Sequence, residues 1–218
     1  MLLADVPMPA TVAARPRDAR GYPVPAITPW QDGVPVFATN GVARAFLCAV
    51  EHRCSVCGTT MDGPVWRVVG GTEAAAIATE LAAGRPYRNH APTGEAPGHR
   101  ACMLYAAVVC PYLARPNARR GQDVAAHGHT AGRGAARGSG AAVVGYDGYE
   151  FEYGDAVNFT FPVLQEFLPY EVGDEQLPAL VAAIADAPAP DGAAPSYLLD
   201  DEVAAQAAFQ FYIDRFLR

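Results

Sequence analysis

Lysine is absent from this 218-residue sequence, and all sixteen of its basic residues are arginine. This absence excludes a Schiff-base lysine, a lysine general base and the lysine of a P-loop. The histidine-x-glutamate element of zinc deaminases is missing as well, together with the G-x-S-x-G and H-E-x-x-H patterns of hydrolases and metalloproteases. No common catalytic motif therefore names a reaction for this chain.

Long apolar runs are also missing. No segment reaches the roughly 18 consecutive apolar residues that a membrane helix needs. The first ten residues, MLLADVPMPA, lack the basic part and the continuous apolar part of a signal peptide. We therefore expect a cytoplasmic protein, in which a hydrophobic fraction of 51% supplies a packed core.

The net charge of −7 is unevenly distributed along the chain. Residues 1–110 hold nine arginines against eight acidic residues, 111–140 hold five against one, and 141–218 hold two against fourteen. The acidic final segment repels nucleic acid and suits a protein partner. Arginine binds phosphate in a bidentate manner, so the middle segment supplies candidate contacts to a polyanion. These contacts are Arg115, Arg119, Arg120, Arg133 and Arg137.

Hydrophobic periodicity, capping residues and breakers predict the helices. They are expected over 41–52, 73–83, 99–110, 174–187 and 200–217. Pro111 ends the third of them, because proline lacks the N–H that continues a helix. The last helix carries apolar residues at helical spacing, which we expect to face the core: Val203, Ala207, Phe211 and Phe216.

Strand signals occupy different parts of the chain. A short strand is expected over 34–37, where Pro35 restricts it to a sheet edge. Alternating residues predict another strand over 65–69, and Gly-containing turns separate two or three more over 141–161. Residues 85–98 are polar and contain proline, so we expect a loop there.

The chain has five cysteines, and two pairs of residues have the spacing of metal ligands. Cys54 and Cys57 form a C-x2-C knuckle followed by glycine, while His99 and Cys102 lie three apart at the start of a predicted helix. Thiolate and imidazole are the preferred ligands of Zn²⁺, and four of them close a tetrahedral structural site. The sequence therefore predicts one structural zinc ion.

Two other residues compete for a place in this site. Cys110 lies eight residues beyond Cys102, about 12 Å along an intact helix, so one ion cannot bind both. It is interpreted as the buried end of the helix, with a redox or nucleophilic role as the alternative. His52 could replace His99, although it falls on the preceding helix. Cys48 fits a small core residue, and the knuckle alone could also be a redox dithiol.

The knuckle, strand-bearing segment and helix resemble the treble-clef zinc fingers. The stretches RGYPVPAITPWQDGVPVF (20–37), RCSVCG (53–58) and PGHRACMLYAAVVCPYL (97–113) look like an uncharacterised bacterial and phage family. The resemblance covers residues 20–115. It implies a zinc-binding fold and brings no established activity.

Together these features predict an α+β protein with four segments. Residues 1–29 form an extended N-terminal arm, and residues 30–114 form a zinc-stabilised treble-clef-like core. A flexible loop rich in glycine and arginine follows over 115–140. Residues 141–218 form an acidic α+β region, with a small antiparallel sheet and C-terminal helices.

The expected function is that of a zinc-stabilised binding protein, whose partner is a protein or a nucleic acid. One alternative is a biosynthetic or hydrolytic enzyme, with a pocket between the zinc core and the C-terminal sheet. Aromatic residues would line that pocket, unless they only pack in the core: Trp66, Tyr146, Tyr149 and Tyr153. A second alternative is an HNH-like nuclease with His90 as its base, accompanied by Asn89 and Asp62.

Overall fold

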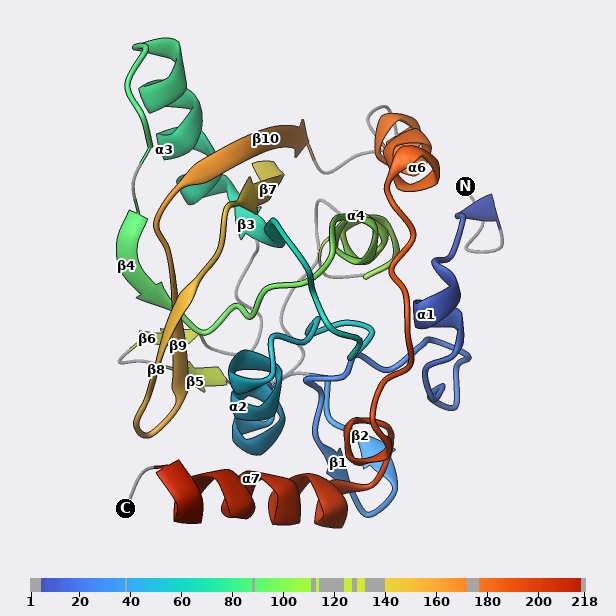
Figure 1. Ribbon diagram of the computed structural model, residues 1–218. Helices are drawn as coiled ribbons and strands as arrows, with labels where there is room; N and C mark the ends of the chain where they lie inside the picture. The colour runs from blue at the N-terminus through green and yellow to red at the C-terminus, as the bar shows by residue number, and fades with distance from the viewer. Residues whose placement is uncertain are drawn as a thin grey trace.

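A computed structural model gives the arrangement of the elements (Figure 1). The structure describes residues 5–37, 39–87, 89–110, 113, 124–126, 129–131, 140–171 and 177–216. Most of the predicted flexible loop over 115–140 falls outside these residues, and so do all five of its arginines. Within the described part, the chain is an α+β protein with small antiparallel sheets.

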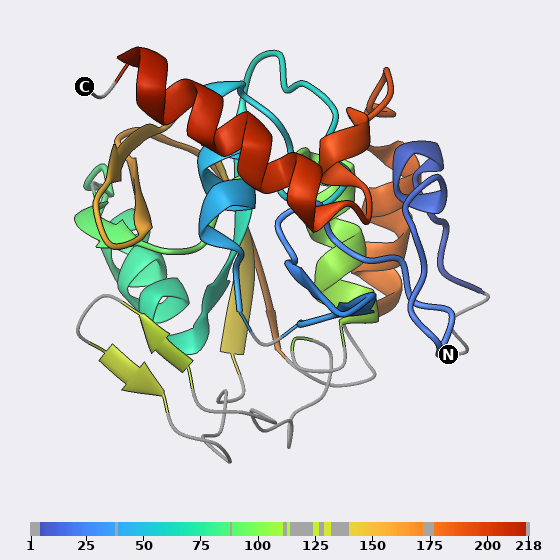
Figure 2. The same ribbon diagram turned by 90° about the horizontal axis from the view of Figure 1, so that it is seen from below.

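The central sheet has three antiparallel strands in the order β10-β7-β3. Its bounds are Val65–Gly70 for β3, Gly140–Tyr146 for β7 and Leu164–Glu171 for β10. The middle strand, β7, is buried from Ala141 to Tyr146, because helices cover both faces of the sheet. Figure 2 shows α3 (Gly71–Ala82) on one side, with α4 (Arg100–Val109) and α6 (Leu177–Asp186) on the other.

A second sheet has the order β4-β9-β8, with bounds Asn89–Thr93, Val157–Phe161 and Glu150–Tyr153. Strand β9 alternates buried and half-buried residues, so that Val157, Phe159 and Phe161 enter the core. Two hairpins complete the sheets. One pairs β1 (Trp30–Gln31) with β2 (Val34–Pro35), and the other pairs β5 (Val124–Ala126) with β6 (His129–Ala131).

The remaining helices of the described part belong to the first 50 residues and to the C-terminal end of the chain. Helix α1 (Ala10–Ala13) lies in the N-terminal arm, and α2 (Val42–Val50) carries seven buried residues. The 3-10 turn η2 (Ser196–Leu198) leads into α7 (Glu202–Phe216), which packs against α2. Phe46 of α2 meets Phe209 of α7 edge to face, with ring centroids 5.2 Å apart.

The predicted apolar stripe of the last helix is wrong. Val203 is 81% exposed, Phe211 is 56% exposed and Ala207 is exposed as well, while the side chain of Phe216 lies outside the described part. The face that meets α2 carries Ala205, Phe209 and Tyr212. Apart from Phe216, the predicted residues fit a period of 3.6 as well as the observed ones do, so periodicity alone could not distinguish the buried face from the exposed one.

Most predicted elements are present within two or three residues of their expected ends. The expectation of a loop over 85–98 is wrong for residues 89–93, where β4 pairs with β9, and the described residues on either side of this strand are irregular. Strand β10 was not predicted, and it contains Pro169. A proline is compatible with this strand because β10 is an edge of its sheet. The central sheet joins β3, which precedes the predicted loop, to β7 and β10, which follow most of it. The division of the chain into four segments stays a prediction.

Among the described residues, every helix is too short or too polar to cross a bilayer.

Candidate metal centre

The first half of the site is the turn that follows α2. The Cys54 N–H donates to the Thr59 carbonyl at 2.9 Å, and the Gly58 N–H donates to the Cys54 carbonyl at 2.8 Å. Gly58 has a φ of +82°, which is in the left-handed region that glycine adopts without strain. These bonds curl the chain so that the sulfurs of Cys54 and Cys57 lie on the same side of the turn.

The second half of the site is the start of α4, where His99 is the N-cap residue. Just before it, Gly98 exchanges two backbone hydrogen bonds of 2.8 Å with Trp66 of β3. A Cβ on Gly98 would lie 2.9 Å from the Cys54 sulfur, so the close approach of the two halves requires glycine. Ser55 links the halves further, because its N–H donates to the Pro97 carbonyl at 2.9 Å.

The four predicted ligands come together in this structure. Their ligand atoms all lie within 4.8 Å of one another, and the three cysteines are fully buried. A Zn–S bond of about 2.3 Å places two sulfurs of a tetrahedral site roughly 3.8 Å apart. The Cys57 sulfur is 3.5 Å from Nδ1 of His99. The donor set and its size both fit a zinc ion.

The protein also fixes the orientation of the imidazole. Nε2 of His99 lies 3.0 Å from the Thr60 carbonyl oxygen, which accepts but cannot donate. The proton of a neutral ring therefore belongs on Nε2, and Nδ1 presents its lone pair to the sulfurs. Orientation of a ligating histidine by a carbonyl is a common feature of metal centres.

Hydrogen bonds around the sulfurs favour thiolates. The Thr59 hydroxyl lies 3.2 Å from the Cys57 sulfur, and the His99 N–H donates to the Cys54 sulfur at 3.4 Å. Hydrogen bonds from the thiols of Cys102 and Cys54 lower the pKa of Cys57 far below its ordinary value. Hydrogen bonds with Cys54 and Cys57 raise the pKa of Cys102, so of these two sulfurs Cys57 is the first to carry a negative charge.

The imidazole responds to this charge. Burial disfavours a charged ring, but hydrogen bonds with Cys54 and Cys57 outweigh it and raise the pKa of His99 to about 10. A cation replaces this proton when it binds, because metal ligation requires the neutral imidazole and deprotonated thiols.

The competing residues lie outside the cluster formed by the described residues. Cys110 is the C-cap of α4, at the opposite end of the helix from Cys102, and it is half-buried where a buried residue was predicted. His52 lies beyond the end of α2 and has a φ of +51°, so its predicted place on that helix is wrong. Its ring packs against Tyr149, with centroids 5.2 Å apart. Cys48 is buried in α2, and burial raises the pKa of its thiol to about 12, which keeps it protonated and unreactive.

The aromatic residues of the predicted pocket have packing roles. Trp66 and Tyr146 are buried, and the Trp66 ring covers Gly145 on the neighbouring strand. The Tyr149 hydroxyl donates to the Ala49 carbonyl at 2.8 Å, and Tyr153 packs against Phe46. The side chains of Asn89 and His90 lie outside the described part, so the nuclease hypothesis stays a prediction.

Three buried arginines were missed by sequence reasoning. Arg67 of β3 pairs with Glu95 at 2.8 Å and with Glu73. Arg15 lies near Gly58 of the knuckle, and Arg44 belongs to α2. The signal was available, because Arg44 and Arg67 each interrupt an apolar run in which a charged residue needs a specific partner.

Comparison with known proteins adds no relative. No family model, no curated protein and no solved structure matches the chain. The metal assignment therefore rests on the chemistry of the four donors and their geometry.

Proposed function

We propose that this protein is a zinc-stabilised binding protein in which the metal has a structural role. The observation that carries the proposal is the complete donor set, with four ligand atoms within 4.8 Å of one another. Four protein ligands complete a tetrahedron and leave no position for a catalytic water or a substrate. When bound, zinc supplies a cross-link between the turn after α2 and the start of α4.

The proposal includes a treble-clef-like arrangement related to the bacterial and phage family. Its support is the order of knuckle, strand-bearing segment and helix, with Trp66 and Gly98 bridging the two halves. Within the described residues, β3 pairs with β7 and β4 pairs with β9, so neither strand pairs with the other. The segment between the ligand pairs therefore extends the zinc module into both sheets.

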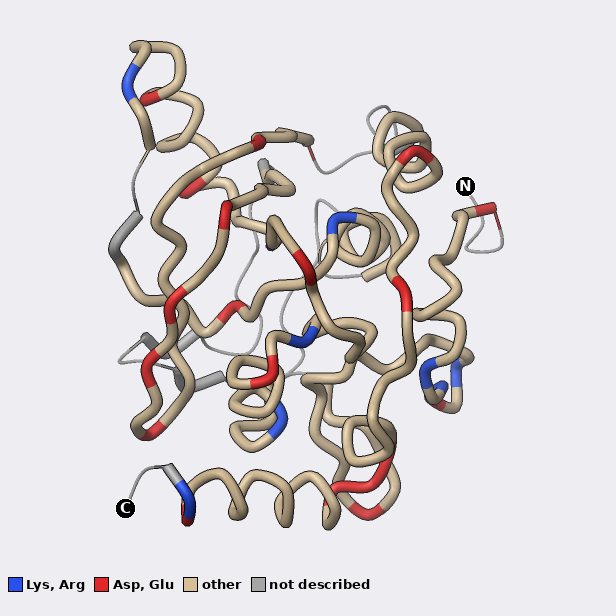
Figure 3. The backbone as a smooth tube through the Cα atoms, viewed as in Figure 1, with Lys and Arg blue, Asp and Glu red and all other residues tan. Residues whose placement is uncertain are grey.

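A protein is the partner that the described surface favours. Helix α7 presents Val203 and Phe211 to solvent, and both side chains offer apolar area that contact with a protein would remove from water. Figure 3 shows acidic residues along the strands of the second sheet and the turns beside them. Asp147, Glu150 and Glu152 are exposed there, which suits a partner with a basic surface.

Cobalt substitution tests whether the centre is closed. Co²⁺ bound by three thiolates and an imidazole gives intense visible absorption that reports tetrahedral coordination. We expect this spectrum to stay unchanged when small ligands such as cyanide are added, because no coordination position is open. A spectrum that shifts on addition would instead indicate an exchangeable position and a catalytic metal.

A salt titration with generic duplex DNA tests the partner class. We expect no binding at physiological salt, because the chain carries a net charge of −7. Salt-dependent binding that weakens in the Arg119→Ala/Arg120→Ala variant, with a slope flatter by about two, would favour a nucleic-acid partner. The matched control variant reverses the charge of Glu150 and Glu152. Replacing acidic by basic residues does not weaken DNA binding, whether the partner is a protein or a nucleic acid.

A further inference from the structure

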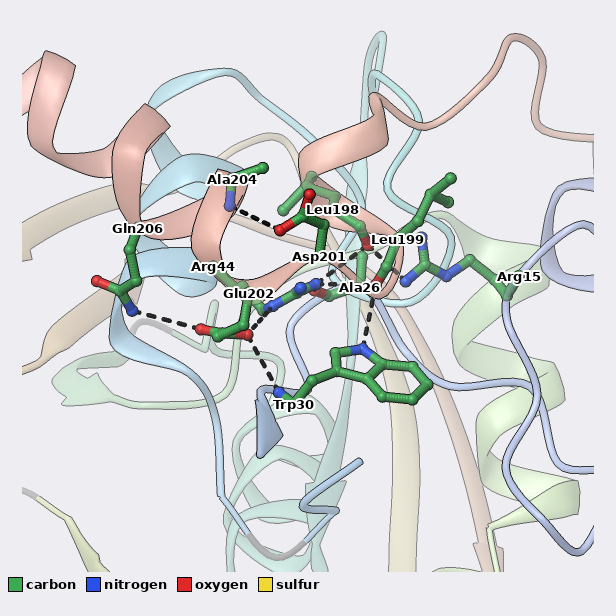
Figure 4. A network of polar contacts seen from close by, with 10 residues as sticks. All are labelled: Arg15, Ala26, Trp30, Arg44, Leu198, Leu199, Asp201, Glu202, Ala204 and Gln206. Atoms are coloured by element: carbon green, nitrogen blue, oxygen red, sulfur yellow. Dashed lines mark hydrogen bonds and ion pairs between the residues drawn. The ribbon is translucent and has the colours of Figure 1, made fainter. Parts of the chain in front are cut away.

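Two buried arginines, Arg15 and Arg44, direct their guanidinium groups toward the same carbonyl group (Figure 4). Arg15 follows α1 in the N-terminal arm and is 3% exposed, while Arg44 belongs to α2 and is fully buried. Both guanidinium groups donate to the Leu198 carbonyl, at 2.6 Å from Arg15 and 3.2 Å from Arg44. Two like charges therefore share one acceptor inside the protein.

Only one of the two charges is balanced by a carboxylate in the part of the chain that the structure describes. Nε of Arg44 pairs with Glu202 of α7 at 2.7 Å. Arg15 donates to two neutral carbonyls, from Nε to Val24 at 2.9 Å and from Nη2 to Leu198. Its Nη1 has no hydrogen-bond partner among the described residues. A buried charge without a counter-charge is strongly unfavourable.

The unpartnered end of Arg15 faces the knuckle. Nη1 lies 3.5 Å from the position that a Cβ would occupy on Gly58, the residue that follows Cys57. Burial is the main cause that lowers the pKa of Arg15 to about 10, and the charge of Arg44 adds to it. The thiols of Cys48, Cys57 and Cys54 act in the opposite direction. Because Cys48 stays protonated, Cys57 and Cys54 of the ligand cluster are the members of this group that bring negative charge near Arg15.

We propose that Arg15 is the buried counter-charge of the metal centre. The proposal rests on the proposed zinc site. One Zn²⁺ with three thiolates and a neutral imidazole carries a net charge of −1, which the guanidinium neutralises. Neither charge is screened by water, so each stabilises the other more than it would at the surface.

This pairing links the metal to both ends of the chain. Arg15 holds the N-terminal arm through Val24 and holds the segment before α7 through Leu198. Docking of these segments brings the positive charge to the centre. Zinc binding would displace the protons of the thiols and of the imidazole, and the resulting net charge of −1 is the one that the docked arginine balances. Coupling between two equilibria is reciprocal, so metal binding stabilises the docked arm to the same extent that the arm increases metal affinity.

The affinity of the full chain for Zn²⁺ tests the proposal, measured by competition with a chromophoric chelator. Arg15→Met removes the charge, Arg15→Lys keeps it, and Arg17→Met changes an exposed arginine of the same arm. We expect Arg15→Met to weaken zinc binding by about 10- to 100-fold, the usual effect of losing a group that supports metal ligands. Arg15→Lys and Arg17→Met should stay close to the wild type.

Thermal unfolding supplies a second readout that a purely structural role would not reproduce. Arg15→Met should lower the melting temperature of the zinc-loaded protein and leave that of the metal-free protein unchanged or raised. Equal losses in both forms, with unchanged zinc affinity, would overturn the proposal and assign Arg15 only to its two carbonyls. If the metal-free protein does not fold, the zinc affinities of Arg15→Met and Arg15→Lys are compared. Weaker binding by Arg15→Met alone supports the proposal, and equal affinities overturn it. A wild type that binds no zinc would overturn the structural zinc as well, which distinguishes the two failures.

Discussion

Replacement of Gly58 by alanine is a sensitive probe of the knuckle. Gly58 has a φ of +82°, and an added Cβ would lie 2.9 Å from the Cβ of Ala194 and 3.2 Å from that of Ala26. Gly63 is a matched control, because its φ is +91° and an added Cβ would meet no atom within 4 Å. The two substitutions share the backbone strain and differ in the steric clash.

The expected magnitudes follow from these two contributions. Alanine in the left-handed region costs about 1–2 kcal/mol, which applies to both Gly58→Ala and Gly63→Ala. Forcing a methyl group into a packed core adds about 1–3 kcal/mol, which applies to Gly58→Ala alone. The loss in free energy of unfolding should therefore be about 2–5 kcal/mol for Gly58→Ala and about 1–2 kcal/mol for Gly63→Ala.

Urea unfolding of the zinc-loaded variants measures this difference. Gly58→Ala should also weaken zinc binding, because the methyl group displaces the turn that carries Cys57 or the segment around Ala194. Gly63→Ala should bind zinc like the wild type. Equal stability losses for the two variants would refute the close packing of the knuckle against residues 26 and 194.

Two further predictions concern the core. Phe46 is buried between α2 and α7, with ring contacts to Phe209 and Tyr212, so Phe46→Ala should cost about 3–5 kcal/mol by urea unfolding. A loss below about 1 kcal/mol would contradict the packing of α7 on α2. Burial raises the pKa of Tyr146 to about 12 from an ordinary value of 10. The neutral phenol is thus favoured in the folded state, and its contribution to stability is complete below pH 10 and lost between pH 10 and 12. Unfolding at pH 8, 10 and 12 should show this decline, and Tyr146→Phe should make it shallower. An identical decline in that variant would assign the alkaline loss to other groups.

The metal site was predictable because its information is local. Cys54 and Cys57 share one turn, and His99 and Cys102 share one helix start, so spacing within each pair determines which side chains meet. The helices α2 and α4 were predictable for the same reason, since their periodicity and terminal residues lie within a short window.

What the sequence did not reveal depends on contacts between distant segments. Strands β4 and β10 are stabilised by pairing with β9 and β7, and their own residues include prolines. The buried face of α7 was missed because contact with Phe46 decides between two apolar stripes. Arg15 and Arg44 are buried because Leu198, more than 150 residues away, accepts from both.

The zinc content of the purified chain tests the structural metal centre most directly. Elemental analysis should give close to one zinc per wild-type chain. Cys57→Ala removes one ligand of the cluster and should lose the metal, while Cys110→Ala changes a thiol at the far end of α4 and should retain it. Zinc that is absent from the wild type, or that persists in Cys57→Ala at the wild-type level, would contradict the structural metal centre.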